Sequence, residues 1–411
     1  MMGPKETRHP LGRLFGQPDF VRLWAVGGLT NAMRWVEILV AGVYVFEATG
    51  SALAVSLLAL VRALPMLVFG AVAGALAETL DRRRLLLAGQ ALSCASTCGI
   101  LALALAGALQ PWHLGVSSFL GGLVWTGEMA SRRRMVTEAA GEADMVPALA
   151  TDSLTSNTTR MLGPLLGGAL YQGLGLAAAY GVAAGCYLVT ASLLAGVRHA
   201  QAPRRLQPRR LAGDVADAVR VVGRFPALQA VILVTLAMNL FGFCVTAVLP
   251  ALGAQAFGAS PFQIGLLTAA EPAGALLTGL VLSTRRGIPL SAPLMVAGCA
   301  FFMLCLLVVA MAGSLPVAVA VLMVGGIGTA LFAALQTALP VTQAPAEARS
   351  RVLGLVTTCI GLGPAGALTI GALADHWGPG VAIPAMASAG LVLLGYTATI
   401  ARRAPIEERT R

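Results

Sequence analysis

Apolar residues run along the chain in continuous segments of about twenty, separated by short polar stretches. A helix of about 20 apolar residues is long enough to cross roughly 30 Å of hydrocarbon. Membrane barrels instead alternate apolar and polar residues in strands of about ten. We therefore expect an all-α membrane protein with twelve transmembrane helices, at residues 23–46, 52–77, 85–107, 112–130, 153–173, 176–197, 228–250, 261–283, 290–313, 315–341, 352–374 and 380–401.

The composition fits a chain that is dissolved in lipid. Only 11% of the residues are charged, and the mean hydropathy is +0.81. A polar head precedes the first apolar run, which is too long for the apolar part of a cleavable signal peptide. The first helix is therefore expected to direct its own insertion.

The basic residues predict the orientation in the membrane. Of the 28 Lys and Arg residues, all but Arg34, Arg62 and Arg160 fall in the two termini or in the loops after every second helix. Because cytoplasmic loops are rich in Lys and Arg, we expect both termini to be cytoplasmic. The net charge of +10 then reflects topology, and no nucleic-acid partner is expected. The Arg-rich, Ala-rich usage suggests a multi-pass protein of a bacterial inner (plasma) membrane.

The two halves of the chain repeat one another. "LGPLLGGALYQGLG" from Leu162 is echoed by "LGPAGALTIGALADHWG" from Leu362, and "GALAETLDRRR" from Gly74 by "GLVLSTRRG" from Gly279. Repeats half a chain apart predict a duplicated six-helix unit. The expected organisation is a cytoplasmic head (1–22), an N-terminal bundle (23–197), a basic cytoplasmic linker with a surface helix (198–227), a C-terminal bundle (228–401) and a cytoplasmic tail (402–411).

The turn after the second predicted helix resembles the signature of the major facilitator superfamily, G-x-L-A-D-R-x-G-R-R. Three positions depart from it: Glu78 stands for Asp, Thr79 for Arg and Asp81 for Gly. "TGSALAV" (49–55), "RALP" (62–65), "RMLGPLLGG" (160–168) and "RSRVLGL" (349–355) resemble the bacterial drug, macrolide and siderophore exporters. The signature residues are Gly74, Leu76, Ala77, Glu78, Asp81, Arg82 and Arg83.

This resemblance covers nearly the whole chain. It implies two pseudo-symmetric six-helix bundles that form a secondary active transporter, expected to be a proton-coupled antiporter. The expected activity is efflux of a small organic solute, such as a drug, a siderophore or an anionic metabolite. An importer or symporter, and a non-transporting receptor with the same fold, remain alternatives. The expected partners are the small-molecule substrate, protons and the lipid bilayer, and the protein is expected to be a monomer.

Charged residues inside the predicted helices are the first candidates for function, because each costs about 2.5 to 3.5 kcal/mol to insert. The third helix of each triplet carries none in its interior, whereas five of the others do. This division resembles the arrangement in the family, where the third helices are peripheral and the others enclose the cavity. The charged residues are Arg34, Glu37, Arg62, Glu128, Arg160 and Glu271.

Asn31, Arg34 and Glu37 form a polar stripe on one face of the first helix. Their spacing would let Arg34 and Glu37 pair directly, with Arg62 of the second helix at similar depth. The stripe could bind substrate, or it could be a structural ion pair. With three arginines against Glu37 and a peripheral Glu128, the cavity of the amino half should be net positive and favour an anionic solute over a lipophilic cation.

Glu271 lies in the middle of the eighth helix, with no partner within one turn on that helix. Burial disfavours the ionised form of a carboxyl group, so Glu271 could load and release a proton near neutral pH. Glu37 is the second candidate for this role. The alternative is a permanent salt bridge from Glu271 to an arginine across the cavity. Asn239 in the seventh helix is expected to be a neutral neighbour.

Two further groups are expected to act between helices. A cytoplasmic gate or inter-helix latch is predicted around the signature turn and the end of the fourth helix. Arg160 is expected to brace the fifth helix, before a glycine-rich stretch that permits close helix packing or bending. The gate comprises Gly74, Glu78, Asp81, Arg82, Arg83, Glu128 and Arg132, and the packing motif comprises Arg160, Gly163, Pro164, Gly167 and Gly168.

Other function classes lack their residues. The only lysine is Lys5, and no G-x-x-x-x-G-K motif is present, so an ATP-driven pump is not expected. His9, His113, His199 and His376 all fall in loops or at helix ends, and neither G-x-S-x-G nor H-E-x-x-H occurs. The seven cysteines all lie in predicted helices and are expected to pack there as free thiols. We therefore expect no enzyme, no metal and no cofactor.

Overall fold

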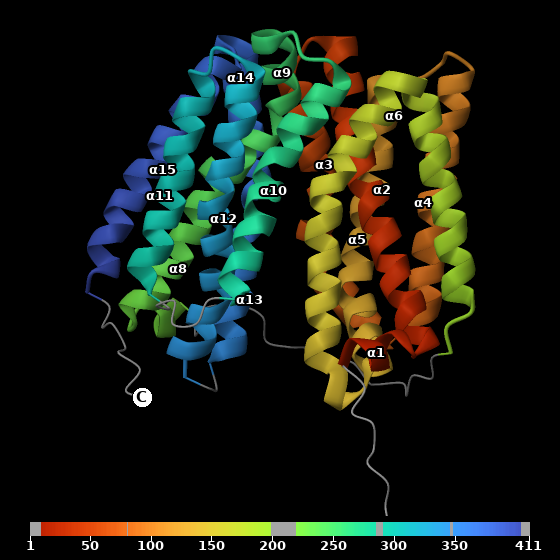
Figure 1. The fold of residues 1–411 in the computed structure, drawn as a ribbon, viewed down its shortest axis with the longest axis horizontal. Helices are drawn as coiled ribbons and strands as arrows, with labels where there is room; N and C mark the ends of the chain where they lie inside the picture. The colour runs from red at the N-terminus through yellow and green to blue at the C-terminus, as the bar shows by residue number, and fades with distance from the viewer. Residues whose placement is uncertain (1–9, 80, 199–218, 285–290, 346–347, 404–411) are drawn as a thin grey trace, which may run out of the picture. The chain divides into compact units, whose positions relative to one another are not determined.

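The computed structural model describes residues 10–79, 81–198, 219–284, 291–345 and 348–403. Almost all of these residues are helical, and no strand occurs among them (Figure 1), which confirms the prediction of an all-α chain. Residues 1–9 of the predicted head, with Lys5, and most of the predicted linker and tail lie outside the described residues, as does most of the expected surface helix of the linker.

The chain divides into two compact units. Unit 1 comprises Met1–Val40 and Val61–Gln207, and unit 2 comprises Ala41–Leu60 and Pro208–Arg411. The separation into bundles at 23–197 and 228–401 stays a prediction. The helices that build unit 1 are α1 (Pro10–Phe15), most of α2 (Pro18–Thr49) and of α3 (Ala52–Thr79), α4 (Arg82–Leu105), α5 (Pro111–Ala140) and α6 (Met145–Ala195), with the short 3-10 turn η1 (Glu142–Asp144) between the last two.

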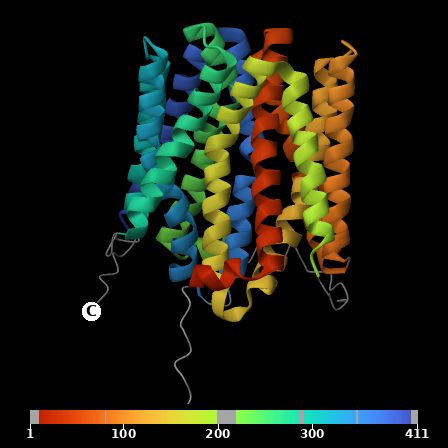
Figure 2. The same cartoon turned by 45° about the vertical axis from the view of Figure 1, so that its right-hand side comes forward.

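Inside unit 1, α4 lies beside both α5 and α6, as the two views in Figures 1 and 2 show. The short helix α1 lies across one end of these helices, where Leu14 joins an apolar cluster with Phe20, Leu86 and Met135. Residue Gly175 interrupts α6 with φ 78° and ψ 176°, a backbone conformation in which glycine has no steric penalty. This helix is therefore two segments, as the predicted boundary between residues 173 and 176 requires.

Unit 2 is built of longer helices and several short irregular ones, with α15 lying beside α11 and α8. The seventh predicted span is not one straight helix, because a π-helical turn and a 3-10 turn interrupt it. The elements are α8 (Pro226–Ala237), η2 (Met238–Gly242), η3 (Phe243–Ala247), α9 (Leu249–Phe257), α10 (Pro261–Thr284), α11 (Ala292–Ala310), α12 (Leu315–Gln343), α13 (Arg349–Ile360), α14 (Gly363–Trp377) and α15 (Pro379–Ala401).

Ten helical segments of the described chain are long and apolar enough to cross a membrane. The whole of α6 is counted there as one segment, although Gly175 interrupts it. Helix α5 is not counted among the ten. Separating α6 at Gly175 and adding α5, which carries Glu128 and Arg132, agrees with the twelve predicted spans.

Close backbone contacts hold pairs of helices together at glycines in both units. In unit 1, a Cβ atom at Gly122 of α5 would overlap the carbonyl oxygen of Arg62 on α3. In unit 2, a Cβ atom at Gly326 of α12 would meet the carbonyl oxygen of Glu271 on α10 at 2.6 Å, and one at Gly274 would overlap the carbonyl of Met323. Only glycine lets two backbones approach this closely.

We expect Gly274→Ala to lower the melting temperature of the purified protein, because the added methyl group pushes α10 and α12 apart. Overpacking of this kind costs about 1 to 3 kcal/mol. Gly279→Ala, on the same helix, is the matched control, because no atom lies within 4 Å of its Cβ position. Thermal unfolding followed by size exclusion measures the difference, and equal melting temperatures would contradict this packing.

Candidate functional site

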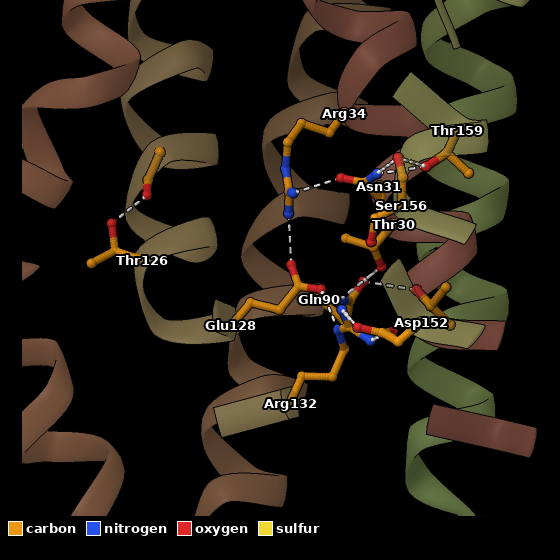
Figure 3. A network of polar contacts seen from close by, with 12 residues as sticks. Thr30, Asn31, Arg34, Gln90, Thr126, Glu128, Arg132, Asp152, Ser156 and Thr159 are labelled. Atoms are coloured by element: carbon orange, nitrogen blue, oxygen red, sulfur yellow. Dashed lines mark hydrogen bonds and ion pairs between the residues drawn. The ribbon is translucent and has the colours of Figure 1, made fainter. Parts of the chain in front are cut away.

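Four buried side chains of alternating charge connect three helices of unit 1. Arg34 on α2 donates from Nη2 to Oε2 of Glu128 on α5 at 2.7 Å. The other Glu128 oxygen lies 3.3 Å from Nε of Arg132, one turn later on α5. Arg132 in turn donates to both carboxylate oxygens of Asp152 on α6, at 2.5 and 3.2 Å. All four side chains are between 6% and 13% exposed. We call them the charge chain (Figure 3).

Neutral groups fix the position of Arg34 in this chain. Asn31 accepts a hydrogen bond from Nη1 of Arg34 at 3.0 Å, and its own amide donates to Oγ1 of Thr159 at 2.5 Å and to the carbonyl of Ser156 at 3.2 Å. The guanidinium carbon of Arg34 lies 5.4 Å from the ring centre of Trp125, within cation–π range. Arg34 is thus held by a carboxylate, an amide and an indole, and Figure 3 shows the polar part of this arrangement.

Glu37 belongs to a second buried polar group. Its carboxylate is 8% exposed and accepts a hydrogen bond from Thr97 of α4 at 3.2 Å. Arg62 of α3 supplies the strongest electrostatic attraction to it, and the Tyr187 hydroxyl of α6 faces the same carboxylate. Glu37 is therefore grouped with Arg62, Thr97 and Tyr187, and Arg34 of the charge chain also acts on it electrostatically.

The expected direct pairing of Arg34 with Glu37 is wrong. Side chains on a helix lean toward its N-terminus, so Arg34 extends toward Asn31 and reaches Glu128, away from the residue one turn later. The position of Glu128 at the edge of the cavity stays a prediction; its side chain is 6% exposed and contacts two arginines.

These partners offset part of the positive charge that was predicted for the cavity. Within the charge chain two arginines face two carboxylates, and Arg62 faces Glu37. Asp152 was not among the sequence candidates. The polar residues at 152, 155, 156 and 159 recur at helical spacing, a pattern that could have revealed this face of α6.

The described residues of the predicted gate connect helices within unit 1. Asp81 caps α4 by accepting a hydrogen bond from the backbone nitrogen of Arg84 at 3.0 Å. Arg82 donates to Glu138 of α5 at 2.7 Å, and Arg83 donates to the last carbonyl groups of α6. Gly74 and Glu78 lie in α3, but their side-chain surroundings fall outside what the structure describes. A gating role for the set stays a prediction.

The glycine-rich stretch of α6 packs on α2. A Cβ atom at Gly163 would overlap the side chain of Trp35, and one at Gly167 would lie 3.1 Å from the carbonyl oxygen of Val36. Pro164 and Gly168 are buried beside them. Arg160 lies one turn earlier, with its guanidinium carbon 6.0 Å from the Trp35 ring centre. The stretch therefore sets how closely α6 approaches the helix that carries Arg34.

In unit 2, Glu271 is 7% exposed and accepts a hydrogen bond from the Thr329 hydroxyl of α12 at 2.5 Å. This hydroxyl partner comes from a neighbouring helix and was not anticipated. Asn239 lies in the π-helical turn η2 and donates to the carbonyl of Thr235 at 2.9 Å. A Cβ atom at Gly366 of α14 would overlap the carbonyl of Leu240, so this turn lies directly against α14.

Among the described residues, no group of three His, Cys, Asp or Glu side chains is placed to hold a metal ion. All seven cysteines are free thiols, and Cys244, Cys299, Cys305 and Cys359 are buried. The polar chemistry of the described chain is therefore concentrated in the charge chain, in the Glu37 group and around Glu271.

Comparisons with known proteins cover nearly the whole chain. The family described as transmembrane secretion effector matches residues 13–410. The multidrug efflux pump Tap of Mycolicibacterium fortuitum is 28% identical over 87% of this chain and 90% of its own length. The uncharacterized MFS-type transporter YfiS of Bacillus subtilis (strain 168) is 26% identical over 66% of this chain and 65% of its own length.

Solved structures share the fold at low sequence identity. The bacterial Spinster homologue in its inward-facing, unoccupied conformation aligns with a TM-score of 0.69, at 14% identity over 93% of this chain and 95% of that one. The POT family transporter PepTSo aligns with a TM-score of 0.73, at 13% identity over 94% and 98%. These likenesses confirm the predicted fold of a major facilitator transporter.

Proposed function

Because the chain belongs to the transmembrane secretion effector family of major facilitator transporters, we propose that it exports a small drug-like solute in exchange for protons, by alternating access. The similarity to the multidrug efflux pump Tap supports efflux. The single observation that carries proton coupling is the buried Glu271 carboxyl group, which contacts a hydroxyl group from the adjacent helix.

A threonine hydroxyl suits a group that changes its protonation state. It can donate to a carboxylate and accept from a carboxylic acid, so Thr329 can stay bonded to Glu271 in both forms. Glu128 lies 2.7 Å from a guanidinium nitrogen of Arg34 and 3.3 Å from one of Arg132, so it is an ion-pair partner in the charge chain. We therefore propose Glu271 as the first candidate for the proton and keep Glu37 as the second.

The substrate class that we propose is a neutral or amphiphilic organic molecule. The charge chain pairs two arginines with two carboxylates, which weakens the case for an anionic solute. Asn31, Arg34, Glu37, Arg62 and Asn239 remain the proposed substrate-facing set. Arg34 with Trp125 offers hydrogen-bond donors beside an aromatic face, groups that can orient a mainly apolar ligand.

Transport in proteoliposomes tests this proposal. We expect radiolabelled antibiotics of several classes, offered as a panel, to accumulate when a pH gradient is imposed, and accumulation to stop when a protonophore collapses that gradient. Accumulation that is indifferent to the protonophore would contradict proton coupling. In cells, uptake of a panel compound instead of its expulsion would favour an importer, and an absence of counterflow would favour a receptor.

We also propose a bacterial inner-membrane location with both termini in the cytoplasm, on the distribution of arginines. In a variant without native cysteines, a cysteine at Gln110, before α5, is expected to react in intact cells with an impermeant thiol reagent. A cysteine at Arg83, before the buried part of α4, is expected to react only after the cells are opened. Reaction of a cysteine at Arg83 in intact cells would contradict the proposed orientation and indicate the opposite one.

A further inference from the structure

The hairpin that joins α2 and α3 belongs to unit 2, although most of both helices belongs to unit 1. Helix α2 passes from unit 1 to unit 2 between Val40 and Ala41, and α3 returns between Leu60 and Val61. Neither helix is interrupted at these points. We call residues 41–60 the hairpin, and its contacts are with elements of the second half of the sequence.

Asp375, in the last turn of α14, contacts the beginning of α3. Its Oδ2 accepts a hydrogen bond from the Ser51 hydroxyl at 2.9 Å, and its Oδ1 accepts one from the backbone nitrogen of Leu53 at 3.3 Å. Ser51 in turn accepts from the backbone nitrogen of Ala54 at 3.0 Å. The first turn of a helix has unpaired N–H groups and a positive dipole, so a carboxylate from another helix caps it favourably.

One turn further along α3, the Ser56 side chain packs on the backbone of α14 at Gly371. Ser56 is fully buried, and a Cβ atom at Gly371 of α14 would overlap its side chain. The Ser56 hydroxyl has no hydrogen-bond partner among the described residues. A buried unpaired hydroxyl is destabilising, and it would regain water if the helices separated. The docked hairpin is thus held by a polar contact while carrying a group that favours release.

We propose that Asp375 and Gly371 form a latch that docks the hairpin on α14 and opens once in each transport cycle. The inference rests on the proposed function, because alternating access requires the two units to move against each other. The hairpin is covalently continuous with unit 1, so such a movement must either undock it or bend α2 and α3. Undocking is favoured because Asp375 is exposed and can exchange both hydrogen bonds for water.

With both termini cytoplasmic, the hairpin lies at the outer end of the transporter. Opening of the latch would then accompany release of the solute to the outside. Pro65 lies inside α3, shortly after the hairpin, and provides the competing explanation, in which α3 bends while the hairpin stays docked.

Cross-linking distinguishes the two explanations. In a variant without native cysteines, Ser51→Cys with Asp375→Cys is joined by a short membrane-permeant bis-thiol reagent that reducing agent can cleave. We expect the linked protein to transport at least about tenfold more slowly, with recovery after reduction. The control pair is Ser96→Cys with Ser117→Cys, whose native hydroxyls are 3.0 Å apart and join α4 to α5 inside unit 1.

The linked control pair is expected to keep its rate within about twofold, because both helices move with one unit. Unchanged transport by the linked Ser51–Asp375 pair would overturn the latch and favour bending at Pro65. An absence of transport before any cross-linking would instead count against the proposed function. The two failures are therefore distinguishable.

A second measurement does not depend on the cysteine pair. In the cysteine-free variant, Ser56→Cys is expected to react slowly with a thiol reagent, and to react about tenfold faster when Asp375→Ala is added, since removal of one cap favours the open state. Ser291→Ala is the control, because Ser291 caps its own helix α11 by accepting from Leu294. Equal reaction rates with and without Asp375→Ala would overturn the latch.

Discussion

Glu271→Gln is expected to abolish solute transport driven by a pH gradient, while exchange of labelled for unlabelled solute stays measurable in the same proteoliposomes. Glutamine keeps the size of the side chain and still offers an oxygen to the Thr329 hydroxyl, which bonds Glu271 at 2.5 Å. It cannot carry a proton. Exchange requires no net cycle of protonation, so the variant should lose gradient-driven transport and keep solute exchange.

Thr268→Val is the control for this experiment. Its hydroxyl lies on the same helix α10 but bonds the carbonyl of Ile264 on that helix at 2.8 Å, so its removal should leave both assays unchanged. Gradient-driven transport at the wild-type rate in Glu271→Gln would move the proton elsewhere, and Glu37 would then be the first candidate.

Glu128→Gln is expected to lower the amount of folded protein sharply. The change leaves Arg34 without its carboxylate in a site where the side chain is 13% exposed, and removing one partner of a buried ion pair typically costs about 3 to 5 kcal/mol. Arg132 is affected less, because Asp152 still bonds it through both oxygens. Fluorescence-detected size exclusion measures the abundance.

The pairing predicts a specific rescue. Arg34→Gln added to Glu128→Gln should restore abundance without restoring transport, because no buried charge is stranded but the substrate-facing cation is gone. The same change should not rescue Glu37→Gln, in which the stranded cation is Arg62. Rescue of Glu37→Gln by Arg34→Gln would return Arg34 to the pairing that its spacing suggested.

The exposed pair of Asp19 and Arg22 supplies the control. These side chains are 29% and 38% exposed and lie 3.2 Å apart. Surface pairs contribute about 0 to 1 kcal/mol, so Asp19→Asn should leave abundance almost unchanged. If Glu128→Gln and Asp19→Asn gave equal abundance, the charge chain would be of no more importance to folding than a surface contact.

Local patterns in the sequence were enough to predict most of the fold. Continuous apolar runs indicate helices, and Gly175 ends one of them where the predicted boundary lies. The π-helical turn at Asn239 could not be predicted, because the sequence there is as apolar as in a regular span. That turn lies against α14 at Gly366, and such a contact depends on a residue distant in the sequence.

The sequence was enough to select charged residues of the candidate site by their position within an apolar run. It was not enough to predict which residues they contact. A charge inside an apolar run is visible in the sequence, so Arg34, Glu37 and Glu271 could be selected. Which carboxylate meets Arg34 depends on the direction in which its side chain leaves the helix and on the approach of α5. Asp152 lies in a stretch of α6 rich in Thr and Ser, so the sequence pattern does not distinguish it from its polar neighbours.

The glycine crossings in the two units make Arg62 and Glu271 counterparts. Each residue presents its carbonyl oxygen to a glycine of a neighbouring helix, Gly122 in one unit and Gly326 in the other. The backbone contact fixes where each side chain begins but places no demand on its charge. Under the predicted duplication, one copy could therefore acquire an arginine and the other a glutamate without any change in how the helices cross. The proposed difference in function between the halves would then depend on single side chains attached to the same kind of helix crossing.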